Sequence, residues 1–214
     1  MSRLLPIAML AFGLSITHAA GIAPGAEAIT PLLVGSRVPA VSMHALDGTS
    51  APLQDVVGGK PTILVFYRGS WCPFCNLQLS RLNGIQDQVK ALGYQIIAVT
   101  PDQPIDIKKT LDKNKLTYTI YSDSDFAAIN AFGVGYRVPA EIVEKSRGYG
   151  IELPPLPDRS GAGLPVPAVF IIDAKGIIQF SYANPDYRIR LSSELLLTAA
   201  KTSLAVNPLQ PPAQ

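Results

Sequence analysis

The apolar positions along the chain fall into two kinds of run, continuous and helically spaced. Ile63 to Tyr67 and Tyr94 to Thr100 are continuous runs rich in β-branched and aromatic residues, which is typical of strands buried on both faces. A third run, Ala168 to Ile172, is followed by an Asp-Ala-Lys-Gly turn and a returning strand from Ile177 to Tyr182. This pattern predicts a sheet whose central strands are covered on both sides.

Between these runs the apolar residues recur at helical spacing. Leu82, Ile85 and Val89 are spaced in this way, and Gly93 is a natural helix C-cap. A mixed central sheet flanked by helices, an α/β layer structure, is therefore expected. The remaining predicted elements are helices over Asn76 to Leu92, Pro104 to Lys115, Ser124 to Phe132, and Ser192 or Ser193 to Ala205, and a short strand over Thr117 to Tyr121.

The segments outside these elements suggest where the domain begins and ends. Residues 21–35 are rich in Ala, Gly and Pro and are expected to form a flexible leader, and residues 207–214 a disordered tail. Residues 38–53 alternate around Asp47-Gly48, which predicts an N-terminal β-hairpin extension. Residues 137–166 are dense in Pro and Gly and are interpreted as an inserted loop, either functional or bland, with one helical turn near 140–146. The main domain is thus expected over residues 36–206.

Residues 1–20 have the features of a secretory signal peptide. Arg3 precedes an apolar run from Leu4 to Ile16, and Thr17-His18-Ala19 supplies the small residues of a cleavage site. The alternative is a membrane anchor, although the apolar run is short for a bilayer span. A signal peptide would place the protein outside the cytoplasm, in the bacterial periplasm.

Composition narrows the class of protein further. The formal net charge of +2 over 214 residues gives no reason to expect binding to nucleic acid. The chain has only two cysteines, Cys72 and Cys75. A disulfide across so short a loop would remove little entropy from the unfolded chain, so the spacing favours redox chemistry over a structural bridge. An inert disulfide or two buried thiols are the alternative.

The chemistry is concentrated in Thr62 to Cys75, TILVFYRGSWCPFC. A buried strand leads through a tight turn to Cys72, and Pro73 is suited to the first turn of a helix. Backbone N–H groups and the helix dipole at that position favour a thiolate. Cys72 is therefore predicted to be the attacking thiolate. Cys75, one helical turn further, is predicted to be the less exposed, resolving thiol.

The segments VFYRGSWCPFC, IIAVTPD and VPAVFIIDAKGIIQFSYANPDYR resemble the alkyl hydroperoxide reductase / thiol-specific antioxidant group, the peroxiredoxin-like proteins of the thioredoxin-fold superfamily. The resemblance covers residues 35–205. It implies a thioredoxin-like fold and a cycle in which a Cys72–Cys75 disulfide is reopened by a thioredoxin-like or membrane dithiol reductant. No other cofactor and no metal are implied. It also implies a cis peptide bond at Val166-Pro167, next to the cysteines.

Several further residues are assigned roles on this basis. Substrate or partner docking is expected at Trp71, Pro73, Phe74, Val166 and Pro167, and simple packing is the alternative for the two aromatic residues. Arg68 and Ser70 are candidates to support the thiolate or a peroxide, although Arg68 is interpreted first as a solvated turn residue. Asp186, Tyr187 and Arg188 are expected to pack at a helix entry and form a salt link.

The substrate is left open between a peroxide and a disulfide. Members of the family it resembles carry the motif Pro-x-x-x-Thr-x-x-Cys, which ends at the peroxide-attacking cysteine. This chain has Val65 in place of the proline and Gly69 in place of the threonine, and it has Pro167 where the family has an arginine. A thiol peroxidase and a thioredoxin-like protein-disulfide reductase are therefore both retained. A metal-delivery protein, of which copper carriers are an example, is a remote third hypothesis, with His44 as the one histidine after the signal peptide. The oligomeric state is not indicated by the sequence.

Overall fold

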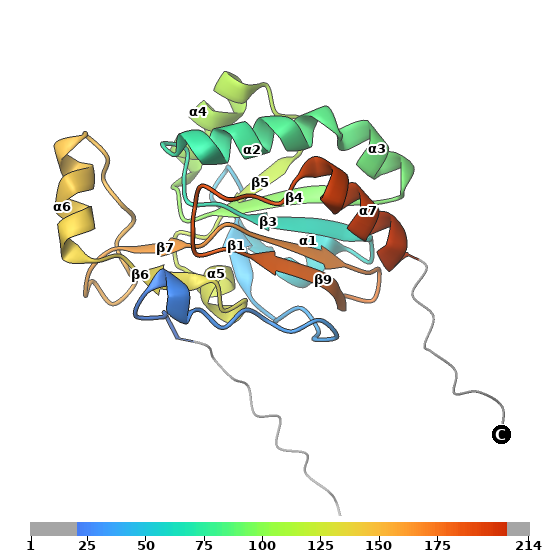
Figure 1. Ribbon diagram of the computed structural model, residues 1–214, viewed down its shortest axis with the longest axis horizontal. Coiled ribbons are helices and arrows are strands. Elements are labelled where there is room, and N and C mark those ends of the chain that lie inside the picture. The colour runs from blue at the N-terminus through green and yellow to red at the C-terminus, as the bar shows by residue number, and fades with distance from the viewer. Residues whose placement is uncertain (1–20, 205–214) are drawn as a thin grey trace, which may run out of the picture.

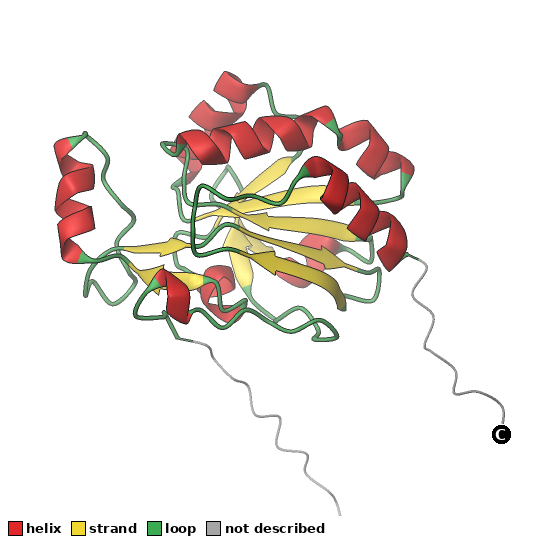
Figure 2. Cartoon of the chain, in the orientation of Figure 1, coloured by secondary structure: helices red, strands yellow, loops and turns green. Residues whose placement is uncertain are grey.

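The computed structural model describes residues 21–204, which fold around a seven-stranded mixed sheet with helices on both faces (Figure 1). Figure 2 shows the strands (yellow) as a central layer between the helices (red). The strand order is β2-β1-β5-β4-β3-β8-β9. The strands are β1 Ser42–His44, β2 Ser50–Pro52, β3 Thr62–Phe66, β4 Gln95–Thr100, β5 Thr119–Ser122, β8 Ala168–Ile172 and β9 Ile178–Ala183.

Strand β3 lies at the centre of the sheet, parallel to β4 and antiparallel to β8. All of its residues are buried, as the continuous apolar run predicted. Because successive side chains of a strand point to opposite faces, Ile63 and Val65 enter one hydrophobic core and Leu64 and Phe66 the other. The strand is thereby clamped between two cores, which fixes the direction in which its C-terminal end presents the following turn.

One face of the sheet is covered by four helices, α2 Pro73–Gly84, α3 Gln86–Ala91, α4 Pro104–Asn114 and α7 Ser193–Ser203 (Figure 1). The single helix predicted over Asn76 to Leu92 is thus two helices, because the backbone at Ile85 leaves the helical conformation (φ −109°, ψ 5°). Ser192 caps α7 by accepting a hydrogen bond from the Leu195 N–H at 3.2 Å. Cys72 and Cys75 belong to the core on this face.

The other face is covered by α1 Leu53–Val57 and α5 Ala127–Ala131. Its centre is a group of aromatic rings in which Phe132 lies 5.0 Å from Phe66 and 4.9 Å from Phe170, centroid to centroid. The buried carboxylate of Asp123 accepts hydrogen bonds from the N–H groups of Ala128 and Ile129 and so holds the start of α5. Burial raises the pKa of Asp123 to about 7.

The segment expected to be a flexible leader is docked on the domain, so that expectation is corrected for residues 22–35. A 3-10 helix, η1 Ala26–Ala28, lies within it. The N–H groups of Ala23 and Thr30 donate to the carbonyls of Gly135 and Gly133 at 3.0 and 3.1 Å. Gly133 has φ +67° and no side chain, which allows the Thr30 backbone to come into contact with it. A contact so distant in sequence is not visible in the local composition.

The two short strands β1 and β2 pair antiparallel on either side of Asp47-Gly48. Thr49 stabilises this turn by donating its N–H and hydroxyl hydrogen bonds to Asp47 Oδ1. Strand β1 also pairs with β5, between His44 and Ser122. The pair is consequently the edge of the central sheet and not an extension that stands apart from it.

The Pro- and Gly-rich insertion is more regular than the sequence predicted. Strands β6 Gly135–Arg137 and β7 Gly163–Pro165 form a separate antiparallel pair, and helix α6 Ala140–Gly148 is longer than the single turn expected. Helix α6 has no buried residues and projects from the body of the domain beyond β6 and β7 (Figure 1). The insertion therefore adds a small lobe of its own.

The peptide bond between Val166 and Pro167 is trans, as are all peptide bonds of the described residues, so the predicted cis bond is wrong. The Val166 N–H donates to the Val134 carbonyl at 2.9 Å, and the Pro167 carbonyl accepts from the Asn184 N–H at 3.2 Å. These bonds hold the backbone between β7 and β8 on both sides of the trans peptide bond.

No helix within residues 21–204 is long and apolar enough to cross a membrane. The predicted signal peptide (1–20) and tail (207–214) lie outside the described residues.

Substitution of Gly133 by Ala tests the docking of the leader. A Cβ would collide with the Thr30 carbonyl, and the positive φ adds strain, so Gly133→Ala is expected to lower the free energy of unfolding by ~1–3 kcal/mol. Gly84→Ala is the matched control, because nothing lies within 4 Å of its Cβ position in α2. It should be neutral or stabilising by up to ~1 kcal/mol. Urea unfolding of the reduced proteins measures both, and equal stabilities would contradict the docked arrangement.

Candidate functional site: the Cys72–Cys75 thiol pair

Strand β3 and helix α2 position the two cysteines. Cys72 is the N-cap of α2 with an extended backbone (φ −84°, ψ 114°), and Pro73 begins the helix. The Cys72 carbonyl accepts hydrogen bonds from the N–H groups of Cys75 at 3.1 Å and Asn76 at 3.0 Å. Both cysteines are free thiols and almost fully buried, with exposed fractions of 1% and 0%. The site is therefore a reduced, buried dithiol at a helix N-terminus.

The turn that precedes Cys72 is held by a buried carboxylate. Asp102 Oδ2 accepts a hydrogen bond from the Ser70 N–H at 2.6 Å, and burial raises the pKa of Asp102 to about 6. A Cβ on Gly69 would contact the Trp71 indole and lie 2.9 Å from Asp102 Oδ1. Only glycine fits at this position without displacing one of the two side chains.

The thiols differ strongly in acidity. A hydrogen bond from the Cys75 side chain is the largest influence on Cys72 and lowers its pKa to about 6, although burial opposes the shift. A hydrogen bond from the Cys75 backbone and the charges of Arg68 and Arg190 also contribute to this lower pKa. For Cys75, burial raises the pKa well above its ordinary value, and the hydrogen bond to Cys72 raises it more. At neutral pH the pair is one thiolate and one thiol, as a nucleophile and a resolving group require.

Arg190, in the segment between β9 and α7, reaches the second thiol. Its Nη2 donates to Cys75 Sγ at 3.3 Å, its Nη1 to Gln78 Oε1 at 2.6 Å, and its Nε to the Tyr187 carbonyl at 2.8 Å. Sequence reasoning missed this residue. It lies 115 positions from Cys75, and the only signal was its place two residues after the Asp-Tyr-Arg segment carried by the resemblance.

Arg68 is buried, with 8% of its surface exposed, and is not the solvated turn residue first expected. Its guanidinium lies over the rings of Tyr187 and Trp71, with Cζ 4.1 and 5.0 Å from the ring centroids. Cation–π attraction of this kind holds the charge in place, and the charge favours the Cys72 thiolate.

Comparison with solved structures identifies the fold. The chain aligns with reduced Prx3 in complex with H2O2 from Vibrio vulnificus at a TM-score of 0.65 and 18% identity, covering 79% of this chain and 96% of that one. Peroxidoxin BcpB from Mycobacterium tuberculosis aligns at a TM-score of 0.62 and 16% identity, covering 81% and 97%. These similarities establish the thioredoxin-like fold of the peroxiredoxins.

Sequence comparison identifies the family. Peroxiredoxin Bcp of Escherichia coli K12 is 28% identical over 106 residues, which cover 50% of this chain and 67% of Bcp. The thiol-disulfide oxidoreductase ResA of Geobacillus thermodenitrificans is 29% identical over 118 residues, covering 55% and 67%. Residues 34–181 match the AhpC/TSA family. The chain belongs to the AhpC/TSA family. It is a thiol-dependent oxidoreductase.

Some of the docking residues predicted for this AhpC/TSA protein surround the thiols. Pro73 and Phe74 are exposed on the first turn of α2, and the Phe74 ring meets the Tyr187 ring edge-on at 5.7 Å. Trp71 is half-buried and packs between the core that contains the cysteines and the apolar cluster of the insertion. Val166 and Pro167 are buried, and Val166 joins the core on the opposite face of the sheet. They are therefore not part of an exposed docking surface.

Ser70 is near Cys72, but its polar groups are committed elsewhere. Both its N–H and its hydroxyl are hydrogen-bonded to the Asp102 carboxylate. Ser70 therefore ties the turn before Cys72 to Asp102. The Asp186–Arg188 salt link expected from the sequence is present, with Arg188 Nη2 2.8 Å from Asp186 Oδ2.

Among the described residues, no metal centre is found near the thiols. Within residues 21–204 no three His, Cys, Asp or Glu side chains are grouped to hold an ion. His44 Nε2 instead lies 2.7 Å from Asp125 Oδ2.

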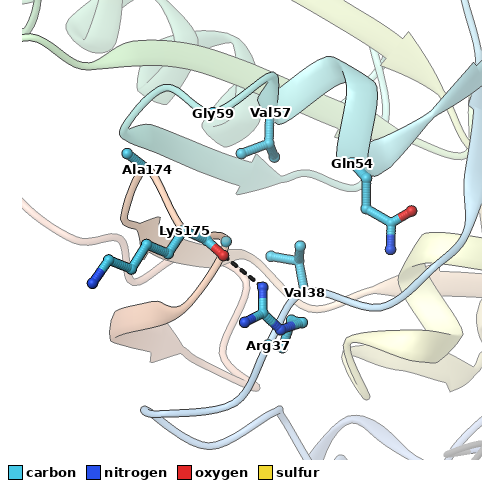
Figure 3. Close-up of a pocket in the computed structure, with 8 residues that line it drawn as sticks. Arg37, Val38, Gln54, Val57, Gly59, Ala174 and Lys175 are labelled. Atoms are coloured by element: carbon cyan, nitrogen blue, oxygen red, sulfur yellow. Dashed lines mark hydrogen bonds between the residues drawn. The ribbon is translucent and has the colours of Figure 1, made fainter.

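A cavity of about 200 Å³ lies beside the start of β3, at the opposite end of that strand from Cys72. Figure 3 shows Arg37 in its wall, donating to the Lys175 carbonyl at 2.6 Å.

The acidity of Cys72 is expected to depend on the Cys75 thiol. Cys75→Ala removes the donor and should raise the pKa of Cys72 by roughly 1–2, because a hydrogen bond to a charged group contributes about 1.5–3 kcal/mol. Cys75→Ser keeps a donor and is the matched control, with a smaller rise. The pH dependence of alkylation by iodoacetamide measures both. A Cys72 pKa that is unchanged in Cys75→Ala would refute the role of this hydrogen bond.

Proposed function

We propose that this protein is an exported, peroxiredoxin-like thiol peroxidase in which Cys72 attacks the peroxide and Cys75 resolves the product. The observation that carries the proposal is the difference in acidity within the Cys72–Cys75 pair. The pKa of Cys72 is lowered to about 6, which favours its thiolate, whereas the raised pKa of Cys75 keeps that thiol protonated. Only the thiolate is nucleophilic, so the two residues are distinguished in the order that the reaction needs.

In the first step the Cys72 thiolate attacks one peroxide oxygen, and the O–O bond breaks. Cys72 becomes a sulfenic acid, and the leaving alkoxide or hydroxide takes up a proton to give an alcohol or water. In the second step Cys75 attacks the sulfenic sulfur, the Cys72–Cys75 disulfide forms, and hydroxide leaves to become water after protonation. Arg190 lowers the pKa of Cys75 against the effect of burial and so assists the loss of its proton.

The cycle closes when an external dithiol returns two electrons to the disulfide. A thioredoxin-like or membrane-bound dithiol protein is suited to this step, and no cofactor besides the disulfide is required. The signal-peptide pattern of residues 1–20 supports export, with the bacterial periplasm as the compartment. A reductant in that compartment is then needed to keep the cysteines active, because exported thiols tend to become oxidised.

A thioredoxin-like protein-disulfide reductase is the second candidate, and two specific observations favour it. Gly69 offers no hydroxyl to a peroxide, and the Ser70 hydroxyl is bound to Asp102. The similarity to ResA, whose name describes a thiol-disulfide oxidoreductase, points the same way. In this reading Cys72 attacks a substrate disulfide to form a mixed disulfide, and Cys75 then releases the reduced substrate.

Single-turnover oxidation of the reduced protein separates the two candidates. The fluorescence of Trp71, the only tryptophan, reports Cys72 oxidation after mixing with H2O2 or an alkyl hydroperoxide. If the protein is a peroxidase, the folded chain is expected to react at least about tenfold faster than the urea-unfolded chain when both are compared at equal thiolate concentration. This ratio corresponds to a difference of ~1.4 kcal/mol in the activation barrier. A rate no greater than that of the unfolded chain would exclude the peroxidase.

The insulin-reduction assay provides the complementary result. Cys72→Ser is expected to abolish both activities, whereas Cys75→Ser should still consume one peroxide per chain and stop at the sulfenic acid. If Cys75→Ser instead accumulates mixed disulfides with insulin and peroxide oxidation is slow, the disulfide reductase is the function.

A further inference from the structure

A basic cleft of about 110 Å³ lies beside the thiol pair, between helix α2 and the segment that leads into α7. Three arginines line it, Arg81 from α2 and Arg188 and Arg190 from the segment, together with Phe74 and Leu77. None of the described residues in its wall is acidic. The cleft is therefore electropositive and lies at the edge of the redox site, since Arg190 also contacts Cys75 Sγ at 3.3 Å.

The three arginines are not equally engaged. Arg188 donates to both Asp186 oxygens, at 2.9 and 2.8 Å, and Arg190 is bound to Gln78 and Cys75. Arg81 is exposed and forms no ion pair with any residue that the structure describes. A carboxylate is the group that an exposed guanidinium fork binds best, through two parallel hydrogen bonds.

An exposed apolar rim surrounds this cleft. Phe74 and Leu77 are 38% and 50% exposed, and Tyr187 and Ile189 are 39% and 52% exposed. Tyr187 is fixed by its ring contact with Phe74 and by its stacking on Arg68. A rigid aromatic surface next to a charged cleft is a common arrangement of protein-docking sites.

We propose that this surface docks a protein dithiol reductant, with an acidic side chain of the partner in the Arg81–Arg188 cleft and its apolar residues against the Phe74 rim. The inference rests on the proposed redox cycle and identifies the chemistry of the partner in its reducing step. A volume of about 110 Å³ fits one side chain and not a whole small molecule, for which pockets of ~300–1,000 Å³ are usual.

Docking at this position brings the partner to the disulfide. One partner thiolate attacks Cys72 Sγ, which forms a mixed disulfide and releases Cys75 as a thiolate that takes up a proton. The partner's second thiol, once deprotonated, attacks the partner's first sulfur, which is bonded to Cys72 in the mixed disulfide, and releases the Cys72 thiolate. Two electrons pass to this protein, and the partner leaves as a disulfide.

Synthetic dithiol peptides test the charge preference. Three peptides share a Cys-Gly-Pro-Cys core and carry Glu, Gln or Lys on both flanks. The protein is oxidised to its Cys72–Cys75 disulfide with diamide, and Trp71 fluorescence follows its reduction. The Glu peptide is expected to reduce it about tenfold faster than the Gln peptide at low salt, the Lys peptide more slowly still, and the differences should shrink at high salt.

Variants locate the effect. Arg81→Gln should remove most of the advantage of the Glu peptide, and Arg81→Glu should shift the preference toward the Lys peptide. Arg188→Gln should also weaken the advantage, because Asp186 then loses its partner and adds a negative charge beside the cleft. Lys201→Gln, at an exposed position of α7, changes the net charge by the same amount and is the matched control. The inference is overturned if wild type reduces the peptides at equal rates, or if the preference survives in both arginine variants as it does in Lys201→Gln.

Two readouts keep this test separate from the proposed function. Reduction by uncharged dithiothreitol should be the same in wild type and every variant, which reports an intact disulfide site. Because diamide forms the disulfide, a protein that fails to react with peroxide can still give the predicted peptide preference.

Discussion

The hydrogen bond from the Cys75 thiol to the Cys72 sulfur is the interaction on which the site depends. It stabilises the thiolate of Cys72 and, by the same bond, disfavours ionisation of Cys75. Burial alone would raise the pKa of both thiols and leave them protonated at neutral pH. The short spacing makes the asymmetry possible, because residues three apart on a helix lie on one face, and only Cys72 is at the open N-terminal end.

The scaffold keeps this bond in a dry, positively charged environment. Strand β3 is fixed between two hydrophobic cores, so the turn after it has little freedom. Asp102, in the loop after β4, ties that turn through the Ser70 N–H, and Arg68 and Arg190 bring two guanidinium groups to the sulfurs from different parts of the chain. The same arginine-rich segment lines the cleft beside α2, so one stretch of chain both tunes the thiols and forms the proposed docking surface.

The sequence predicted the features that depend on local signals. The buried run of β3, the Cys72-x-x-Cys75 motif and the Ser192 cap can each be recognised within a few residues. Long-range contacts were missed: Arg190 reaches Cys75 only through the path of the chain after β9, and residues 22–35 dock only because Gly133 leaves room. The cis bond was inferred from a family resemblance, and here the bond is trans, with hydrogen bonds from the Val166 N–H and to the Pro167 carbonyl on either side of it.

The most direct test of this account is an NMR titration of the reduced protein labelled with ¹³C at the cysteine Cβ atoms, with the two resonances assigned by a Cys75→Ser variant. The account predicts that the Cys72 resonance shifts with a midpoint near pH 6, while the Cys75 resonance stays unchanged up to pH 9. Two resonances that titrate together near pH 9, or a Cys75 resonance that moves first, would contradict it.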